Sequence, residues 1–191
     1  MTWIKTIPLS RGDNRLREAF EAQAAFFPPE YAEQIPGLPQ GDADGIVAAH
    51  SLIPGALRHS FSTLGALLNP SLPLNRRQHE LIAAAVSQTN GTRYCSLCHV
   101  EFLRKATGDD ALAKAVGTDL SSAPLTEVER VIVEYAEQVT RDATRITPAH
   151  HEKLRAAGFD DRGILQVTLI AAWFNSINRV ADALGVGRLI E

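Results

Sequence analysis

Two cysteines and a histidine stand close together in the middle of the chain, in the segment Cys95-Ser-Leu-Cys98-His99. If a helix begins beside Cys95, the positive end of the helix dipole favours its thiolate, the form that attacks peroxides and disulfides. His99 lies four residues later, on the same face of that helix, where an imidazole can take the thiol proton directly or through water. The spacing predicts a reactive thiol with a histidine as its proton-transfer partner.

Glu80 is a polar residue in the middle of a long helical pattern, and six apolar residues follow it, from Leu81 to Val86. A carboxylate beside such a run is expected to be partly buried. If the next helix folds back on this one, Glu80 reaches His99, and a Glu–His–Cys relay results with the carboxylate as the final proton acceptor. Thr92 lies three residues before Cys95, close enough to offer a hydroxyl group.

The same residues fit other interpretations. The segment matches the Cys-x-x-Cys-His pattern of c-type haem attachment, but that attachment needs export, which the first residues of the chain do not indicate. Cys95, Cys98 and His99 are also three possible zinc ligands, with His79 as a fourth brought in by folding. In a purely structural interpretation, Cys95 is a buried thiol and His99 a core histidine with satisfied hydrogen bonds. For Cys98, a small apolar role facing the core is favoured over a redox role.

The elements that must position these residues are predicted to be helices. Asn75 precedes a long apolar-periodic run that ends at Asn90-Gly91, where glycine suits the left-handed position after a helix. A new helix is expected to begin near Cys95 and to end at Gly108. Further helices are predicted over residues 14–27, from 42 or 44 to 50, 54–68, from the capping pattern of Thr126 and Glu129 onward, 147–158, and from 160 or 161 to 184.

No strand alternation persists anywhere, and residues 31–41 are rich in proline and glycine, as loops are. We therefore predict an all-α protein of about eight helices in a single domain over residues 1–191. Its core motif spans residues 74–108, and residues 1–45 form an N-terminal helix and loop extension.

The composition excludes several classes of protein. With 45% apolar and 21% charged residues, the chain is an ordinary globular protein. A net charge of −3, from 19 basic and 22 acidic residues, gives no reason to expect a nucleic acid or an acidic membrane as partner. No apolar run is long enough for a membrane helix, and the first residues do not have the pattern of a signal peptide, so we expect a cytoplasmic protein.

The stretch from Leu74 to Gly108 resembles the core of the alkylhydroperoxidase D-like (AhpD-like) / carboxymuconolactone decarboxylase family. Members of that family carry a Glu, then an Asn-Gly turn, then a Cys-x-x-Cys pair, then a His four residues after the second Cys. The segments Leu154–Phe159 and Ala172–Val186 resemble the end of the family's peroxidase-related branch, so the resemblance extends from about Ile46 onward. It implies an AhpD-like helical bundle.

The register of this resemblance decides which residues matter. Laying Cys95 and Cys98 on the family's cysteine pair puts Phe102 where the His belongs and Ala83 where the Glu belongs. A shift of three residues leaves Thr92 in place of the family's first cysteine. In that register six residues match the family pattern: Glu80, Asn90, Gly91, Tyr94, Cys95 and His99.

The shifted register implies a function and a site. Cys95 takes the position of the peroxidatic cysteine, and His99 and Glu80 take those of its proton relay, while Thr92 and Tyr94 shape the pocket. The resemblance implies a thiol-dependent hydroperoxide reductase of the peroxiredoxin type, with a small hydroperoxide as substrate and a thiol or dithiol as reductant. No metal or organic cofactor is implied, and a homo-oligomer, a trimer or a hexamer, is expected.

Three outcomes of the missing first cysteine stay open. An external thiol could reduce a Cys95 sulfenic acid, or Cys98 could resolve it instead. A disulfide between positions three apart is feasible only if Cys95 lies at the very helix terminus or just outside it. The alternative is a member of the same fold that has lost peroxidase activity and serves as a non-redox decarboxylase-like lyase, a ligand-binding protein or a structural protein.

Overall fold

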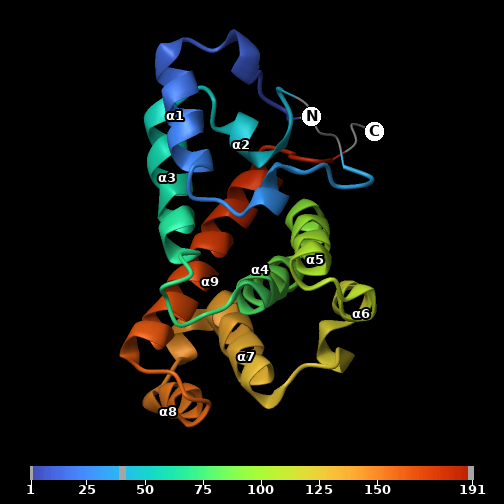
Figure 1. Cartoon of the computed structure of the whole chain (residues 1–191), viewed down its shortest axis with the longest axis vertical. Helices are drawn as coiled ribbons and strands as arrows, with labels where there is room; N and C mark the ends of the chain where they lie inside the picture. Colours follow the sequence, from blue (N-terminus) through green and yellow to red (C-terminus); the bar gives the residue numbers. More distant parts are fainter. Residues whose placement is uncertain (1, 39–41, 189–191) are drawn as a thin grey trace. The chain divides into compact units, whose positions relative to one another are not determined.

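The computed structural model describes residues 2–38 and 42–188, and within these residues the chain consists of α-helices and short 3-10 turns without a β-strand (Figure 1). The chain divides into two compact units, one made of residues 1–69 and 179–191 and the other of residues 70–178. The single domain expected over residues 1–191 stays a prediction. In the described part of the chain, no helix has both the length and the apolar character needed to cross a membrane.

The first unit is built on two paired helices. Helix α1 (Asn14–Ala24) begins at Asp13, whose side chain accepts a hydrogen bond from the backbone of Leu16 at 2.9 Å. Helix α1 packs against α3 (Pro54–Leu67), with the short α2 (Gly45–Ala49) between them in sequence. Buried side chains on α1 and α3 form the core of this unit: Leu16, Ala19, Leu57, Phe61 and Leu64. The predicted loop at 31–41 begins in a 3-10 turn, Pro29–Ala32, and residues 39–41 lie outside the described residues.

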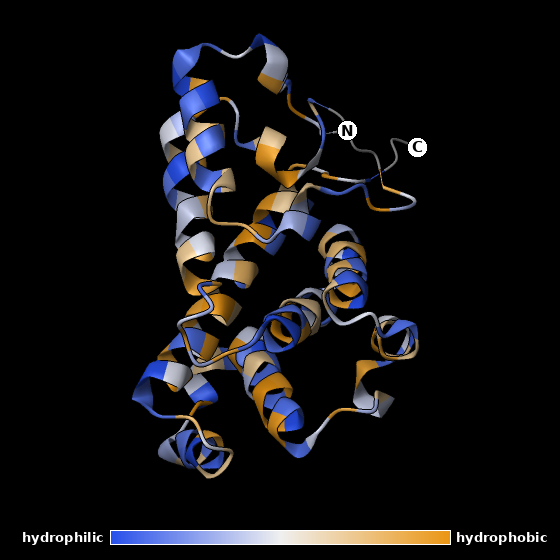
Figure 2. Ribbon diagram, viewed as in Figure 1, coloured by the Kyte–Doolittle hydropathy of each residue, from blue (hydrophilic) through white to orange (hydrophobic). Residues whose placement is uncertain are grey.

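The second unit contains the predicted core motif. Helix α4 packs against α5 and α7, α5 packs against α6, and α7 packs against α8. Figure 2 shows hydrophobic residues along one side of α7 and hydrophilic residues along the other, as expected of a helix that covers a core. The helices of this unit are α4 (Arg76–Asn90), α5 (Arg93–Thr107), α6 (Asp110–Thr118), α7 (Glu127–Asp142), α8 (Pro148–Ala156) and α9 (Asp161–Ala183), the last up to residue 178.

One helix differs from the sequence-based expectation, and the start of another is now exactly placed. Helix α6 was not predicted, although Asp109 caps it by accepting a hydrogen bond from the backbone of Leu112 at 2.8 Å. Helix α5 begins at Arg93, two residues before Cys95, because the left-handed residue Gly91 ends α4 and the chain turns directly into the next helix. The described residues therefore contain nine α-helices, where about eight were expected.

Candidate active site

Helix α4 carries Glu80 into the core of the second unit. Asn75 begins the helix with a capping box, in which its side chain accepts from the backbone of Gln78 at 2.9 Å and its backbone donates to the Gln78 side chain at 3.0 Å. The helix is buried from His79 to Ser87, and Glu80 has no exposed surface at all. A carboxylate in such a place needs charged or hydrogen-bonding partners, because burial of an unpaired charge is costly.

The turn between α4 and α5 fixes where Cys95 lies. Gly91 adopts φ 72°, a left-handed conformation that glycine takes without strain, and ends α4. The backbone N–H of Thr92 then donates to the carbonyl of Ser87 at 2.9 Å, and Thr92 becomes the N-cap of α5. Cys95 is therefore the third residue of the helix, in its first turn, where the helix dipole favours a thiolate.

A partly buried polar network holds the end of α4 against α9. The amide of Asn90 donates to the side-chain oxygens of Asn175 and Asn178, both at 3.0 Å. The amide of Asn178 donates to the hydroxyl of Ser87 at 3.2 Å, and the carbonyl of Ser87 is the one that accepts from Thr92. Because each partner is also held by another residue, this network fixes the turn that precedes Cys95.

The contact between α4 and α5 brings Glu80 and His99 together. Nδ1 of His99 lies 2.7 Å from Oε2 of Glu80, and only 7% of His99 is exposed. The imidazole also stands edge-on to Phe174 of α9, with ring centroids 4.6 Å apart, and to Phe102 at 5.6 Å. A neutral imidazole that donates its Nδ1 proton to the carboxylate carries its lone pair on Nε2, which leaves Nε2 able to act as a base.

Arg76 belongs to the same set of contacts as Glu80 and His99, although the sequence analysis did not single it out. Its guanidinium lies 2.6 Å from Oε1 of Glu80, the oxygen that His99 does not use. The two residues are four apart on α4, the spacing at which oppositely charged side chains meet on a helix. That spacing was the signal that could have revealed the pair.

Both cysteines are free and buried. Burial raises the pKa of the Cys98 thiol far above its usual range, and the nearby Cys95 and Glu80 raise it further, while a hydrogen bond with Tyr94 acts in the opposite direction. Cys98 therefore remains a protonated thiol at neutral pH. It lies within the helix, three residues after Cys95 and inside the core, as the small-apolar-residue interpretation predicts.

His79 is buried beside the cluster and stays neutral. Burial lowers its pKa to about 4, the charge of Arg76 lowers it too, and Glu80 works against both. Its Nε2 accepts from the amide of Gln166 at 3.2 Å, so the ring proton sits on Nδ1, which is buried without a hydrogen-bond partner. His79 does not join Cys95 in a zinc site, and no three His, Cys, Asp or Glu side chains in residues 2–38 and 42–188 are grouped to hold a metal ion.

Comparison with known proteins relates part of the chain to a known family and its fold to solved structures. Residues 54–138, which include Glu80, Cys95 and His99, match the model of the carboxymuconolactone decarboxylase family. None of the curated protein sequences matches this chain. The all-α fold is the AhpD-like fold.

Two solved structures of peroxidase-related proteins resemble the chain over nearly its whole length. The AhpD core protein from Ralstonia eutropha JMP134 is 22% identical with a TM-score of 0.79, covering 99% of this chain and 93% of that one. The protein from Silicibacter sp. TM1040 is 26% identical with a TM-score of 0.77, covering 95% of this chain and 90% of that one. The debrominase Bmp8 is 14% identical, with a TM-score of 0.72 and coverages of 97% and 91%. Residues 54–138 of the chain are thus similar to the carboxymuconolactone decarboxylase family, and the chain shares its fold with AhpD-like, peroxidase-related proteins.

Proposed function

We propose that this protein is a thiol-dependent hydroperoxide reductase, with Cys95 as the nucleophile and His99 and Glu80 as its proton relay. The observation that carries the proposal is the 2.7 Å contact between His99 and Glu80, because His99 lies one helical turn after Cys95 on the same face of α5. The peroxidase-related proteins of the same fold, with TM-scores of 0.79 and 0.77, support it.

The first half-reaction oxidises Cys95. The thiol gives its proton to Nε2 of His99, and the thiolate attacks the terminal oxygen of the hydroperoxide. An S–O bond forms, the O–O bond breaks, and the departing alkoxide takes the proton from the His99 imidazolium, which Glu80 stabilises meanwhile. The products are a sulfenic acid on Cys95 and an alcohol.

The second half-reaction uses two external thiols. The first attacks the sulfenic sulfur of Cys95, which gives a mixed disulfide and water, and the second attacks that disulfide and restores the Cys95 thiol. An external reductant is favoured over Cys98 because a resolving cysteine must attack as a thiolate, and the raised pKa of Cys98 keeps it protonated. A cytoplasmic location, where thiols are kept reduced, is part of this proposal.

A stopped-flow assay tests the proposal. Wild-type protein, mixed with cumene hydroperoxide or hydrogen peroxide and a dithiol, is expected to consume peroxide, and its intact mass should rise by one oxygen on Cys95 when the reductant is left out. Cys95→Ser should abolish both, whereas Cys98→Ser should keep the turnover within about twofold of wild type. No consumption with any dithiol and an unmodified Cys95 would contradict the proposal, and loss of turnover in Cys98→Ser would make Cys98 the resolver.

The second candidate is a member without peroxidase activity, a lyase or ligand-binding protein. Two observations favour it: Thr92 stands at the N-cap position where the sequence comparison expects a cysteine, and a debrominase shares the fold with a TM-score of 0.72. The same assay separates the two candidates, because this alternative requires a Cys95 that peroxide does not oxidise.

The homo-oligomer, a trimer or a hexamer, also belongs to the proposal. Leu165 and Leu169 lie one turn apart on α9 and are 56% and 42% exposed. Large apolar side chains grouped on a surface are typical of contact regions between proteins. Light scattering on the purified protein measures the mass, and a monomer would contradict this expectation.

A further inference from the structure

We propose that a pocket between α7 and α8 binds a small zwitterion, a molecule that carries both an ammonium and a carboxylate group, as a free amino acid does. The pocket has a volume of about 200 Å³, which is below the usual size of pockets for drug-sized ligands. Four residues of α7 and two of α8 line it: Val131, Glu134, Tyr135, Gln138, His150 and Lys153. None of them takes part in the reaction proposed for Cys95, so the inference goes beyond that function.

Helix α7 lines the pocket with hydrogen-bond acceptors. Glu134 and Gln138 are four residues apart, so they lie on the same face of the helix. The carboxylate of Glu134 has no hydrogen bond or ion pair within residues 2–38 and 42–188. The amide nitrogen of Gln138 donates to the carbonyl of Asp142 at 2.8 Å, which leaves the amide oxygen able to accept from a ligand. This side of the pocket can therefore bind an ammonium group.

Helix α8 lines the pocket with hydrogen-bond donors. His150 and Lys153 are three residues apart, again on one face of their helix. The backbone N–H of Thr147 donates to Nδ1 of His150 at 3.1 Å, and this leaves the ring proton on Nε2, because a backbone N–H can only donate. The ammonium group of Lys153 has no partner among the described residues. This side of the pocket can therefore bind a carboxylate group.

Neighbouring charges on the same helices are paired, in contrast to the two charges of the pocket. Arg141 lies 3.1 Å from Glu137 on α7, and Arg155 lies 2.8 Å from Glu152 on α8. The two charged residues of the pocket line it from different helices, yet in the described part of the chain they form no ion pair with each other. Each of them is therefore open to a charged group of a ligand.

These two opposite charges decide the class of the ligand. A simple anion would pair with Lys153 but would also meet the carboxylate of Glu134, and a simple cation would meet the ammonium group of Lys153 in the same way. A zwitterion pairs with both residues at once, with its ammonium group toward α7 and its carboxylate toward α8. The buried Tyr135 and the side chain of Val131 offer apolar surface to the carbon atoms of such a molecule.

Tyr135 is held in place from the core side of the pocket. Its hydroxyl lies 2.9 Å from Oγ1 of Thr168, and Thr168 itself donates to the carbonyl of Ile164 at 2.8 Å, so the tyrosine is the donor in the first pair. Nε2 of His151 lies 3.4 Å from the same hydroxyl. Because these contacts fix the ring, this wall of the pocket exists before a ligand arrives, which lowers the cost of binding.

Nuclear magnetic resonance titrations of the isotope-labelled protein test the proposal. The probes are glycine, β-alanine and γ-aminobutyrate, three zwitterions of increasing charge separation, with acetate and methylammonium as ions of a single charge. All titrations are made near neutral pH and at one ionic strength, because salt screens exposed charges. We expect at least one zwitterion to shift the signals of the pocket residues and to bind at least about tenfold more tightly than either single-charge ion.

Two substitutions locate the binding site. Glu134→Gln and Lys153→Gln should each weaken the binding of that zwitterion by at least about fivefold, because each removes one charge that the ligand pairs with. Both side chains are exposed, so neither substitution is expected to disturb folding. Glu137→Gln on α7 and Lys114→Gln on α6 remove the same charges outside the pocket and should leave the affinity within about twofold of wild type.

Three outcomes would overturn the inference. One is an absence of signal changes at the pocket with every zwitterion at about 50 mM. Another is acetate or methylammonium binding as tightly as the best zwitterion, which would make the pocket a site for simple ions. The third is a pocket substitution that weakens binding no more than its control does. None of these measurements uses peroxide, so their results do not depend on the function proposed for Cys95.

Discussion

Arg76 and Arg77 are neighbours on α4, and each holds a glutamate carboxylate at 2.6 Å. Arg76 binds Glu80, one turn along the same helix, whereas Arg77 reaches across to Glu129 on α7. The pairs differ in the second partner of the carboxylate. Glu80 turns its other oxygen to an imidazole, and Glu129 accepts a backbone N–H at 2.9 Å in the capping box that begins α7.

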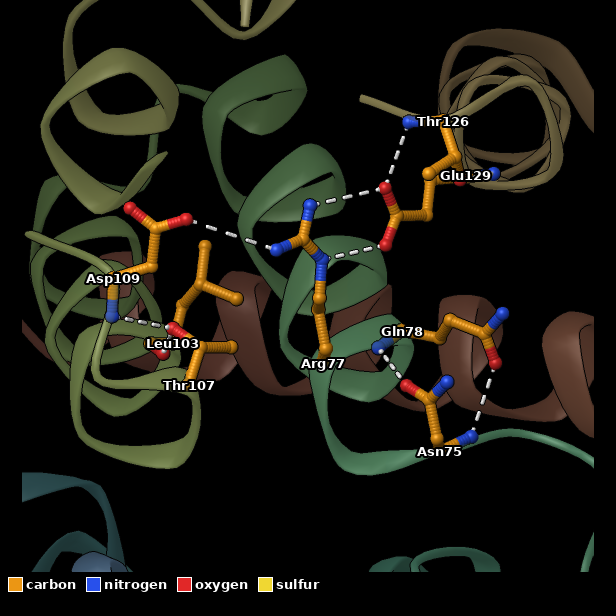
Figure 3. A network of polar contacts seen from close by, with 8 residues as sticks. All are labelled: Asn75, Arg77, Gln78, Leu103, Thr107, Asp109, Thr126 and Glu129. Carbon is orange, nitrogen blue, oxygen red and sulfur yellow. Dashed lines mark hydrogen bonds and ion pairs between the residues drawn. The ribbon is translucent and has the colours of Figure 1, made fainter. Parts of the chain in front are cut away.

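The difference shows that an ion pair does not carry a function by itself. Figure 3 shows Glu129 bound on both sides by groups that do not titrate near neutral pH, the Arg77 guanidinium and the backbone of Thr126, so this pair fastens two helices. Glu80 instead faces a residue that can gain and lose a proton, so its pair can take part in proton transfer. What distinguishes the two pairs is the titratable neighbour.

The largest expected effect comes from neutralising each glutamate. Glu80→Gln should slow the reaction of Cys95 with hydroperoxide by at least about 100-fold, because proton transfer by a positioned group contributes this much. Glu129→Gln should leave that rate within about twofold of wild type. Stopped-flow peroxide consumption measures both rates, and circular dichroism checks that each variant is folded. Equal losses of rate in the two variants would show that the two ion pairs do not differ in their effect on the reaction.

The next effect is a dependence of stability on pH that comes from His79, the buried histidine near Arg76 on α4. His79 has a pKa of about 4 in the folded protein against an ordinary value of 6.5, so between these values the unfolded chain binds a proton that the folded chain does not. Stability is therefore unaffected above pH 6.5 and falls as the pH drops toward 4, by about 3 kcal/mol in total.

Urea unfolding at several pH values measures this dependence. His79→Gln should flatten the fall between pH 6.5 and 4, because an amide does not titrate. His59→Gln, at an exposed histidine of α3, is the control and should keep the wild-type slope. Equal slopes in wild type and His79→Gln would remove His79 from the explanation.

A smaller effect is expected from Arg77→Gln, which removes the ion pair between α4 and α7. The substitution leaves a mostly buried Glu129 without its cation and should lower the free energy of unfolding by about 2 kcal/mol. Urea unfolding at neutral pH measures this loss. Peroxide consumption should stay at the wild-type level, and a changed rate would mean that the two pairs are coupled.

The smallest effect is expected from Thr126→Ala, which removes the N-cap side chain of α7. Its hydroxyl accepts from the backbone of Glu129 at 3.3 Å, and loss of such a cap costs about 1 kcal/mol of stability. Thermal or urea unfolding measures the loss, and peroxide consumption should remain at the wild-type level. A loss of several kcal/mol would show that the capping box supports more than the start of α7.

The sequence predicted most of the helices because their ends carry local signals. Asn75, Gly91 and Thr126 act as the caps that their residue types indicate, and no distant contact is needed to recognise them. The start of α5 was expected near Cys95 and lies at Arg93, because its exact place depends on where the chain leaves α4. Helix α6 was missed because its nine residues give too short a periodic pattern.

The candidate site was predictable only in part. Spacing along one helix relates Cys95 to His99, and it could have related Arg76 to Glu80, since both pairs are four residues apart. The 2.7 Å contact between Glu80 and His99 depends on how α4 packs against α5, which no local pattern specifies. The polar network that holds the turn before Cys95 joins residues almost 90 positions apart, with Asn178 at its far end.

The burial of Cys95 has a consequence for how the reaction would proceed in time. Only 3% of this residue is exposed, so an oxidant reaches the sulfur only when neighbouring side chains move aside. Access would then limit the rate, and small hydroperoxides would react faster than bulky ones. In the proposed reaction, the same barrier would delay a second oxidant molecule, which would turn the sulfenic acid into irreversible sulfinic acid. In the proposed peroxidase, burial of the nucleophile would slow its oxidation and would also protect it from overoxidation.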